Sequence, residues 1–246
     1  DHPTMVKDGS GWGAMAGVSA AYLAHDGFTG APAISMEDGA VEPFWSDLGT
    51  HWYVTEQYIK LYPVCRWAQP PVEAVLALQR RHGFDVSDID TIRIDTFHEA
   101  KRLATKHPTT TEQAQYSLPF SVAAALVHGT IGAEHIADDA LSNPSVGAVQ
   151  DRIEIAEEEA FNTAFPKHRI AQACLTLKDG SQLQSEPTEA RGDPENPVGA
   201  DVIAEKFIGL ATPVLGESRT NDLLTLITGL KTSGDCRPLL AAMAQN

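Results

Sequence analysis

The segment from Tyr58 to Pro71 restricts the fold more than any other part of this chain. It begins as a strand-like run of alternating residues, and Pro63 must end that run because proline has no N–H to donate to a sheet. Pro70 and Pro71 follow, and proline is well tolerated in the first turn of a helix. The segment therefore predicts a rigid corner between a short strand and a helix.

Two cations lie in this corner, Lys60 before Pro63 and Arg66 after it. Lys60 either binds an anion such as a carboxylate or extends its ammonium group into solvent. The planar guanidinium of Arg66 suits bidentate contact with a carboxylate, although a structural ion pair with one of the many acidic residues is equally compatible. The corner is thus a candidate site for a small polyanion.

The periodicity of apolar residues predicts helices at both ends of the chain and a mixed region between them. A glycine-rich helix is expected near residues 9–24. Further helices are expected at 70–83, at 109–129 with an interruption at Pro119, and at 143–150, 200–210, 222–230 and 238–244. Strands are expected at 88–97, 152–155 and 169–178, and the last should return through an Asp179-Gly180 hairpin into 181–186.

This order predicts an α+β fold in which a mostly helical body is interrupted by a smaller α+β lid domain. Residues 1–57 would form part of the helical body and 58–190 the lid. Residues 191–246 would then return to the helical body.

The formal net charge of −15 argues against nucleic acid and anionic membrane as partners, because both require a basic surface. A small anionic substrate needs only a local group of cations, and so it remains compatible with this charge. The apolar runs are too short to cross a bilayer. Three cysteines, at positions 65, 174 and 236, are too few for a disulfide framework, which favours a cytoplasmic location.

The sequence offers no pattern for a metal or an organic cofactor. His128 and His135 are seven residues apart and separated by glycines, so one helical face cannot present both. The glycines near residue 11 do not follow a strand of β-branched residues, as a dinucleotide-binding loop would. A neighbouring Arg66 could lower the pKa of the Cys65 thiol, but a buried and inert thiol is the favoured interpretation.

Five motifs together resemble the MmgE/PrpD family, which includes 2-methylcitrate dehydratase, cis-aconitate decarboxylase and iminodisuccinate epimerase. They are Met5-Val6-Lys7, Lys60-Leu61-Tyr62-Pro63 with Cys65, the segment 112–120 (EQAQYSLPF), Leu177-Lys178-Asp179-Gly180, and the segment 190–197 (ARGDPENP). They occur in the family's order and span nearly this whole chain, which corresponds to about the C-terminal half of a typical member.

The resemblance implies an active site between the helical body and the lid, acting on di- or tricarboxylates without metal or organic cofactor. It assigns catalytic roles to Lys7, Lys60 and Tyr116. It also implies that the substrate is bound by Arg66, Cys65, Gln115 and Ser117.

Three positions depart from the family's pattern. Cys65 stands where the decarboxylase branch has a histidine, and Phe120 where that branch has a tyrosine, with Tyr116 one turn earlier. Gln69 stands where many members of the family carry histidine. The family's catalytic histidines belong to its N-terminal half. Because the chain starts at Asp1 in the middle of a motif, we expect a second polypeptide that supplies this half, or else a homodimer.

The expected function is that of a hydro-lyase that removes water from a carboxylate such as 2-methylcitrate, by proton abstraction α to a carboxylate. Two alternatives stay open. One is an epimerase or isomerase of a dicarboxylate, which would use the same proton abstraction, and the other is a non-catalytic subunit of a two-chain enzyme.

Overall fold

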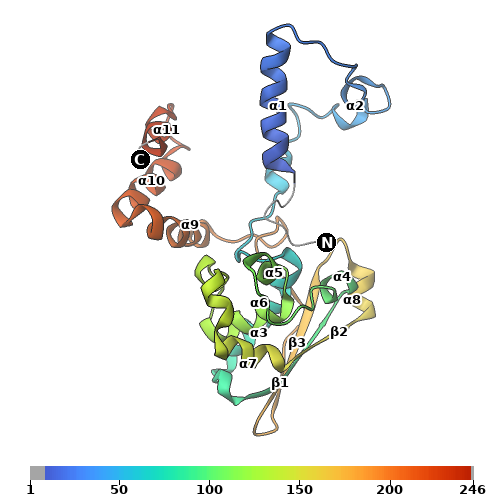
Figure 1. The fold of residues 1–246 in the computed structure, drawn as a ribbon, viewed down its shortest axis with the longest axis vertical. Coiled ribbons are helices and arrows are strands. Elements are labelled where there is room, and N and C mark those ends of the chain that lie inside the picture. Colours follow the sequence, from blue (N-terminus) through green and yellow to red (C-terminus); the bar gives the residue numbers. More distant parts are fainter. Residues whose placement is uncertain (1–8, 245–246) are drawn as a thin grey trace. The chain divides into compact units, whose positions relative to one another are not determined.

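The computed structural model describes residues 9–244, and the chain separates into two compact units, Asp1–Gln57 and Tyr58–Asn246 (Figure 1). The first unit contains α1 (Ser10–His25), α2 (Ile34–Glu37) and two short 3₁₀ turns, Glu42–Phe44 and Tyr53–Glu56. The predicted glycine-rich helix is present as α1. A Cβ atom added at Gly11, Gly13 or Gly17 would meet no atom within 4 Å, so close packing at these glycines is not seen in the described part of the chain.

The second unit is built on a mixed sheet with the strand order β2-β1-β3-β4. β5 also pairs with β3, at the end of β3 opposite to its turn into β4. The strands are β1 (Ile89–Thr96), β2 (Ile153–Glu157), β3 (Ile170–Leu177), β4 (Gln182–Gln184) and β5 (Thr188–Glu189). β1 runs parallel to β2 and antiparallel to β3. All of the predicted strands after residue 88 are therefore confirmed, including the hairpin at Asp179-Gly180.

Alternation of side chains explains how the sheet forms its core. Ile92 and Ile94 of β1 are buried, and their register partners on β3 are Leu175 and Ala173, which are also buried. Alternate residues of β1, such as Arg93, point to the other face and are exposed. This period of two is the pattern of a sheet that is covered on one face.

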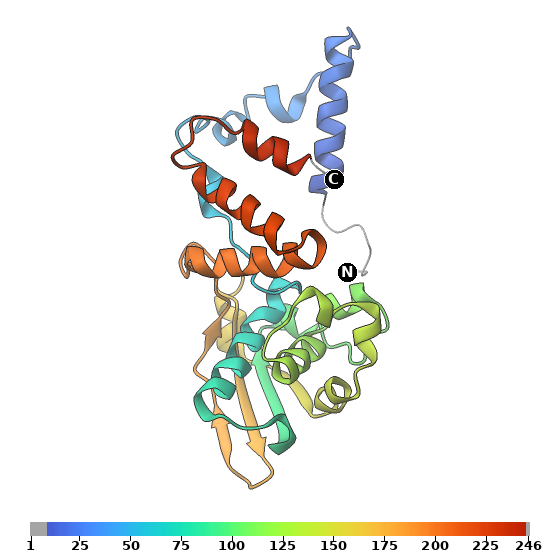
Figure 2. The same ribbon diagram turned by 90° about the vertical axis from the view of Figure 1, so that its left-hand side faces the viewer.

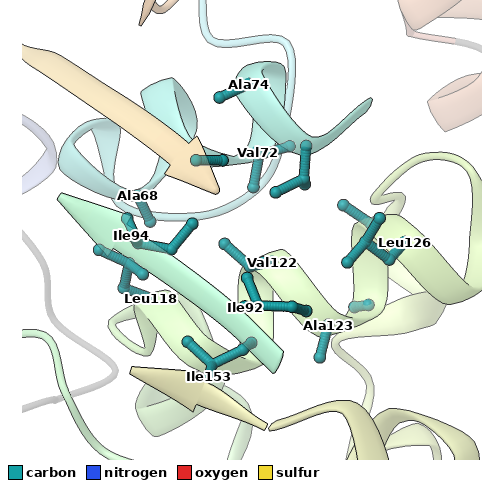
Figure 3. Close-up of a cluster of buried hydrophobic side chains, with 14 of the residues drawn as sticks. Ala68, Val72, Ala74, Ile92, Ile94, Leu118, Val122, Ala123, Leu126 and Ile153 are labelled. Carbon is teal, nitrogen blue, oxygen red and sulfur yellow. The ribbon is translucent and has the colours of Figure 1, made fainter. Parts of the chain in front are cut away.

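Two helices, α3 (Gln69–His82) and α6 (Leu118–His128), pack against each other, and α3 also packs on β3. α7 (Pro144–Asp151) packs on α6. Figure 3 shows Val72 of α3 and Val122 of α6 in one cluster with Ile92 and Ile94 of the sheet. Gly83 and Gly129 end α3 and α6 in the left-handed conformation, as the predicted helix ends require.

The remaining helices are α4 (His98–Lys101), α5 (Thr111–Gln115), α8 (Glu159–Ala164), α9 (Ala200–Leu215), α10 (Glu217–Gly229) and α11 (Arg237–Met243). α10 contacts both α9 and α11, and Figure 2 shows the three helices following one another. Pro119 lies in the first turn of α6, so the interruption predicted at this proline separates α5 from α6. In the part of the chain that the structure describes, no helix is both long and apolar enough to cross a membrane.

The α+β class is confirmed, whereas the short strand expected at Tyr58 is wrong. Residues 58–65 form an irregular segment that bends at 61–64 and has no β-ladder, and it passes through a 3₁₀ turn (Arg66–Ala68) into α3. Its backbone N–H groups donate single hydrogen bonds to a loop and to the end of α5 instead of to a neighbouring strand. The lid and the helical body formed by 1–57 and 191–246 stay predictions.

Candidate functional site

The corner at residues 58–69 is held by the link at residues 190–193, although more than 120 positions separate them in sequence. The amide N–H of Ile59 donates to the carbonyl of Gly192 over 2.9 Å. Gly192 has a φ of +98°, and a Cβ atom added there would lie 2.2 Å from the carbonyl oxygen of Ile59. Glycine is therefore required at this position by its backbone conformation and by the close approach of the other segment.

Arg66 joins the two segments through several hydrogen bonds, and its side chain is only 5% exposed. Its guanidinium donates to Asp193 Oδ2 at 2.5 Å, to the carbonyl of Arg191 at 2.9 Å and to Gln69 Oε1 at 3.0 Å. It also lies 4.8 Å from the ring centroid of Tyr58, a cation–π contact. The guanidinium is thus engaged by the protein itself, and its expected contact with a substrate stays a prediction.

A second buried group joins the same two segments. Glu73, in the first turns of α3, accepts hydrogen bonds from the Tyr62 hydroxyl and from Arg191 Nε, both at 3.0 Å. Burial raises the pKa of Tyr62 to about 12, and the negative charge of Glu73 acts in the same direction. Tyr62 is therefore a neutral donor near neutral pH, and the corner is tied to the link on both sides of Pro63.

A third segment, the end of α5, reaches the corner. The amide N–H of Cys65 donates to the carbonyl of Gln115 over 2.7 Å, so two of the predicted substrate-binding residues lie side by side. Tyr116 follows directly, and the side chains of Cys65, Gln115 and Tyr116 are all half-buried. Their proposed contacts with a substrate are untested by this geometry.

Ser117, by contrast, is fully buried and caps α6. Its hydroxyl accepts from the amide of Phe120 at 3.0 Å and donates to the carbonyl of Thr105 at 2.5 Å. These are the bonds of a helix N-cap, a role that serine commonly fills just before the first turn. The position of Ser117 before Leu118-Pro119 could have indicated this cap from the sequence.

Lys60 is exposed at the corner and has a neighbour that sequence reasoning missed. The ammonium group of Lys206, from α9, donates to the backbone carbonyl of Lys60. The pKa of Lys206 is lowered, first because burial removes water from its ammonium group and then because of the positive charge of Lys60. Lys206 is half-buried, and no feature of the sequence indicates that it would reach the corner.

Of the other two sequence motifs, one lies away from this junction and one cannot be placed. Lys7, with Met5 and Val6, lies outside the described residues. The Leu177–Gly180 motif forms the turn after β3, whereas β5, which leads into the link, pairs with the opposite end of β3. At about 3.3 Å per residue these ends are separated by roughly 23 Å, so this motif has a structural role in the hairpin.

His128 and His135 lie together although, as expected, no helical face presents both. The turn after α6 stacks their rings, with centroids 4.1 Å apart. Within residues 9–244, however, no group of three or more His, Cys, Asp or Glu side chains could hold a metal ion. All three cysteines are free thiols.

Comparison with known proteins identifies the family of the segments that meet at this junction. Residues 62–231, more than half of the chain, match the family described as the MmgE/PrpD C-terminal domain. The chain belongs to the MmgE/PrpD family. The resemblance seen in the sequence motifs is therefore confirmed, and three of the MmgE/PrpD-like motifs meet at the corner.

Several curated proteins are similar to this MmgE/PrpD chain. A cis-aconitate decarboxylase-like protein of Aspergillus oryzae is 24% identical over 80% of this chain and 42% of its own length. A cis-aconitate decarboxylase of Aspergillus terreus is 26% identical over 78% of this chain and 41% of its own length. The mitochondrial 2-methylcitrate dehydratase of Yarrowia lipolytica is 28% identical over 59% of this chain and 30% of its own length. The chain thus spans less than half the length of the relatives it matches.

Proposed function

We propose that this chain provides carboxylate-binding residues for a lyase that removes water from a hydroxy-polycarboxylate such as 2-methylcitrate. The observation that carries the proposal is the meeting of three MmgE/PrpD motifs at a corner that presents Lys60 to solvent. The similarity to a 2-methylcitrate dehydratase supports the choice of substrate.

In this mechanism a base removes the proton on the carbon α to a carboxylate. Negative charge then builds on that carboxylate until the hydroxyl on the adjacent carbon accepts a proton from an acidic group, the C–O bond breaks, and water leaves as the C=C bond forms. Lys60 and Lys7 would stabilise this charge, because cations placed where charge develops lower the barrier most. Tyr116 would take part in proton transfer, with Cys65 and Gln115 beside it contacting the substrate. The base itself would come from the N-terminal half of the family.

Decarboxylation is a second candidate, because most of the similar proteins are cis-aconitate decarboxylases or are named as similar to one. Two of the departures from the family's pattern, Phe120 and Gln69, argue less strongly against this reaction once their surroundings are known. Phe120 is fully buried, and Gln69 is 1% exposed and hydrogen-bonded to Arg66. Both residues belong to the interior of the second unit, so neither distinguishes the two reactions. Cys65 is half-buried at the corner, so its difference from the decarboxylase branch still argues against decarboxylation.

The test is to incubate the purified chain, with any polypeptide that co-purifies, with 2-methylcitrate and with cis-aconitate. Native mass spectrometry would first identify a second chain or a homodimer. A dehydratase increases the ultraviolet absorbance of the conjugated alkene, a decarboxylase releases CO₂, and an epimerase changes only the optical rotation of a chiral dicarboxylate. We expect alkene formation from 2-methylcitrate, strongly reduced by Lys60→Gln.

If neither the chain nor its complex transforms any of these acids, the lyase proposal is wrong. Activity that appears only after a second polypeptide is added would assign the chain to a composite enzyme. We also propose, from the earlier arguments, that the protein works without a cofactor in the cytoplasm. Cell fractionation would test this location, and the mitochondrial location named for the Yarrowia lipolytica relative makes that test worthwhile.

A further inference from the structure

The contact between Lys206 and the corner brings together two cations from distant parts of the chain. Lys206 lies on α9 and donates to the carbonyl of Lys60, 146 positions earlier in the sequence. Each lysine ammonium carries three donors. Among residues 9–244, the backbone carbonyl of Lys60 is the one acceptor that Lys206 contacts, and neither ammonium has a carboxylate within 4.0 Å.

This arrangement of two cations is electrostatically unfavourable by itself. Two like charges close together repel each other, and the half-buried ammonium of Lys206 has lost part of its hydration. The chain has 33 acidic residues and 18 Lys and Arg residues, so acidic partners were plentiful. Arg66, Arg191 and Lys101 each have one. A bound carboxylate would remove both costs, because its two oxygens can accept from two ammonium groups at once.

We propose that Lys60 and Lys206 form a cation pair that binds one carboxylate group of the polycarboxylate substrate. The proposal rests on the proposed function and adds a residue to it. It gives Lys206 two tasks: one N–H holds the backbone of the corner, and the others contact the substrate. A purely structural alternative assigns Lys206 the first task alone.

Substitutions at Lys206 separate the two tasks. Lys206→Gln keeps a side-chain N–H that can reach the Lys60 carbonyl but removes the charge. Lys206→Met removes both the donor and the charge, and Lys206→Arg keeps both. Lys178→Gln is the matched control, because Lys178 is an exposed lysine in the turn after β3.

The measurement is isothermal titration calorimetry of the full 246-residue chain with tricarballylate, a tricarboxylate that has no hydroxyl group to lose. We expect Lys206→Gln and Lys206→Met each to weaken binding by about fivefold or more, while Lys206→Arg and Lys178→Gln stay close to the unsubstituted chain. Lys60→Gln should have a similar effect. The double substitution of Lys60 and Lys206 should raise the dissociation constant by less than the product of the two single fold-changes, because both lysines contact one carboxylate.

The outcomes are distinct. If Lys206→Gln binds as tightly as the unsubstituted chain, Lys206 is only structural and the cation pair is refuted. If Lys60→Gln alone weakens binding, the pair is refuted but the proposed function survives. If the unsubstituted chain does not bind tricarballylate, carboxylate binding by this chain is refuted, and the proposed function and the pair fail together. Thermal unfolding of each variant shows that the comparison is made between folded proteins.

Discussion

Substitution of Gly192 by alanine tests the junction between the corner and the link most directly. A left-handed backbone costs an L-residue about 1–2 kcal/mol relative to glycine. The new Cβ would also lie 2.2 Å from the carbonyl oxygen of Ile59, a backbone atom that cannot rotate away. Separating the two segments breaks the hydrogen bond from Ile59 to Gly192, which contributes about 1 kcal/mol. The free energy of unfolding should therefore fall by about 3 kcal/mol.

For a domain of this size, such a loss lowers the Tm by roughly 6–12 °C. Urea denaturation followed by circular dichroism measures the free energy, and hydrogen exchange at the Ile59 amide reports on the junction itself. Gly180→Ala is the matched control, because Gly180 has a φ of +86° but no atom within 4 Å of an added Cβ. The Gly180→Ala substitution should lower the free energy of unfolding by only about 1–2 kcal/mol. Equal losses in the two variants, with unchanged exchange at Ile59, would refute the close approach.

Two further predictions concern the buried polar groups. Asp193→Asn should lower the free energy of unfolding by about 3 kcal/mol in urea denaturation, because it leaves the guanidinium of Arg66 buried without its charge partner. The exposed Glu195→Gln should leave it within about 0.5 kcal/mol, and equal effects would contradict the buried pair. In an ultraviolet pH titration, Tyr62 should ionise only near pH 12, so stability present below pH 10 is lost as the pH rises through that range. Tyr62→Phe should reduce this loss of stability at high pH, and an unchanged dependence of stability on pH would show that Tyr62 is not the group responsible.

The sequence predicted the regular elements of the second unit well, because their signals are local. The apolar spacing of α3 together with Gly83 marked one helix, and the alternation in β1 and β3 marked the central strands. The segment at Tyr58 was predicted wrongly for a physical reason. Residues 58–60 are all exposed, and burial alternates only from Leu61 onward. The backbone of the segment is hydrogen-bonded to a loop and a helix end, and no strand runs beside it.

The candidate site was only partly predictable, since its geometry depends on contacts between distant segments. The motifs identified Lys60, Cys65 and Gln115 but not their relation to one another. Lys206 carries no motif at all, and only the fold shows that it reaches the backbone of Lys60. For Arg66, the sequence left a substrate contact and a structural ion pair equally open, and the ion pair with Asp193 is the one observed.

The distance in sequence between the corner and its link has a consequence for folding. During synthesis α3, β1 and α6 emerge well before Gly192 and Asp193, and the corner cannot be fixed until these last residues have left the ribosome. Contacts of such long sequence separation are formed late, because closing a loop of this length loses entropy before any contact is made. Lys60 would therefore be among the last side chains to reach its final position, after the hydrophobic core that supports it has already assembled.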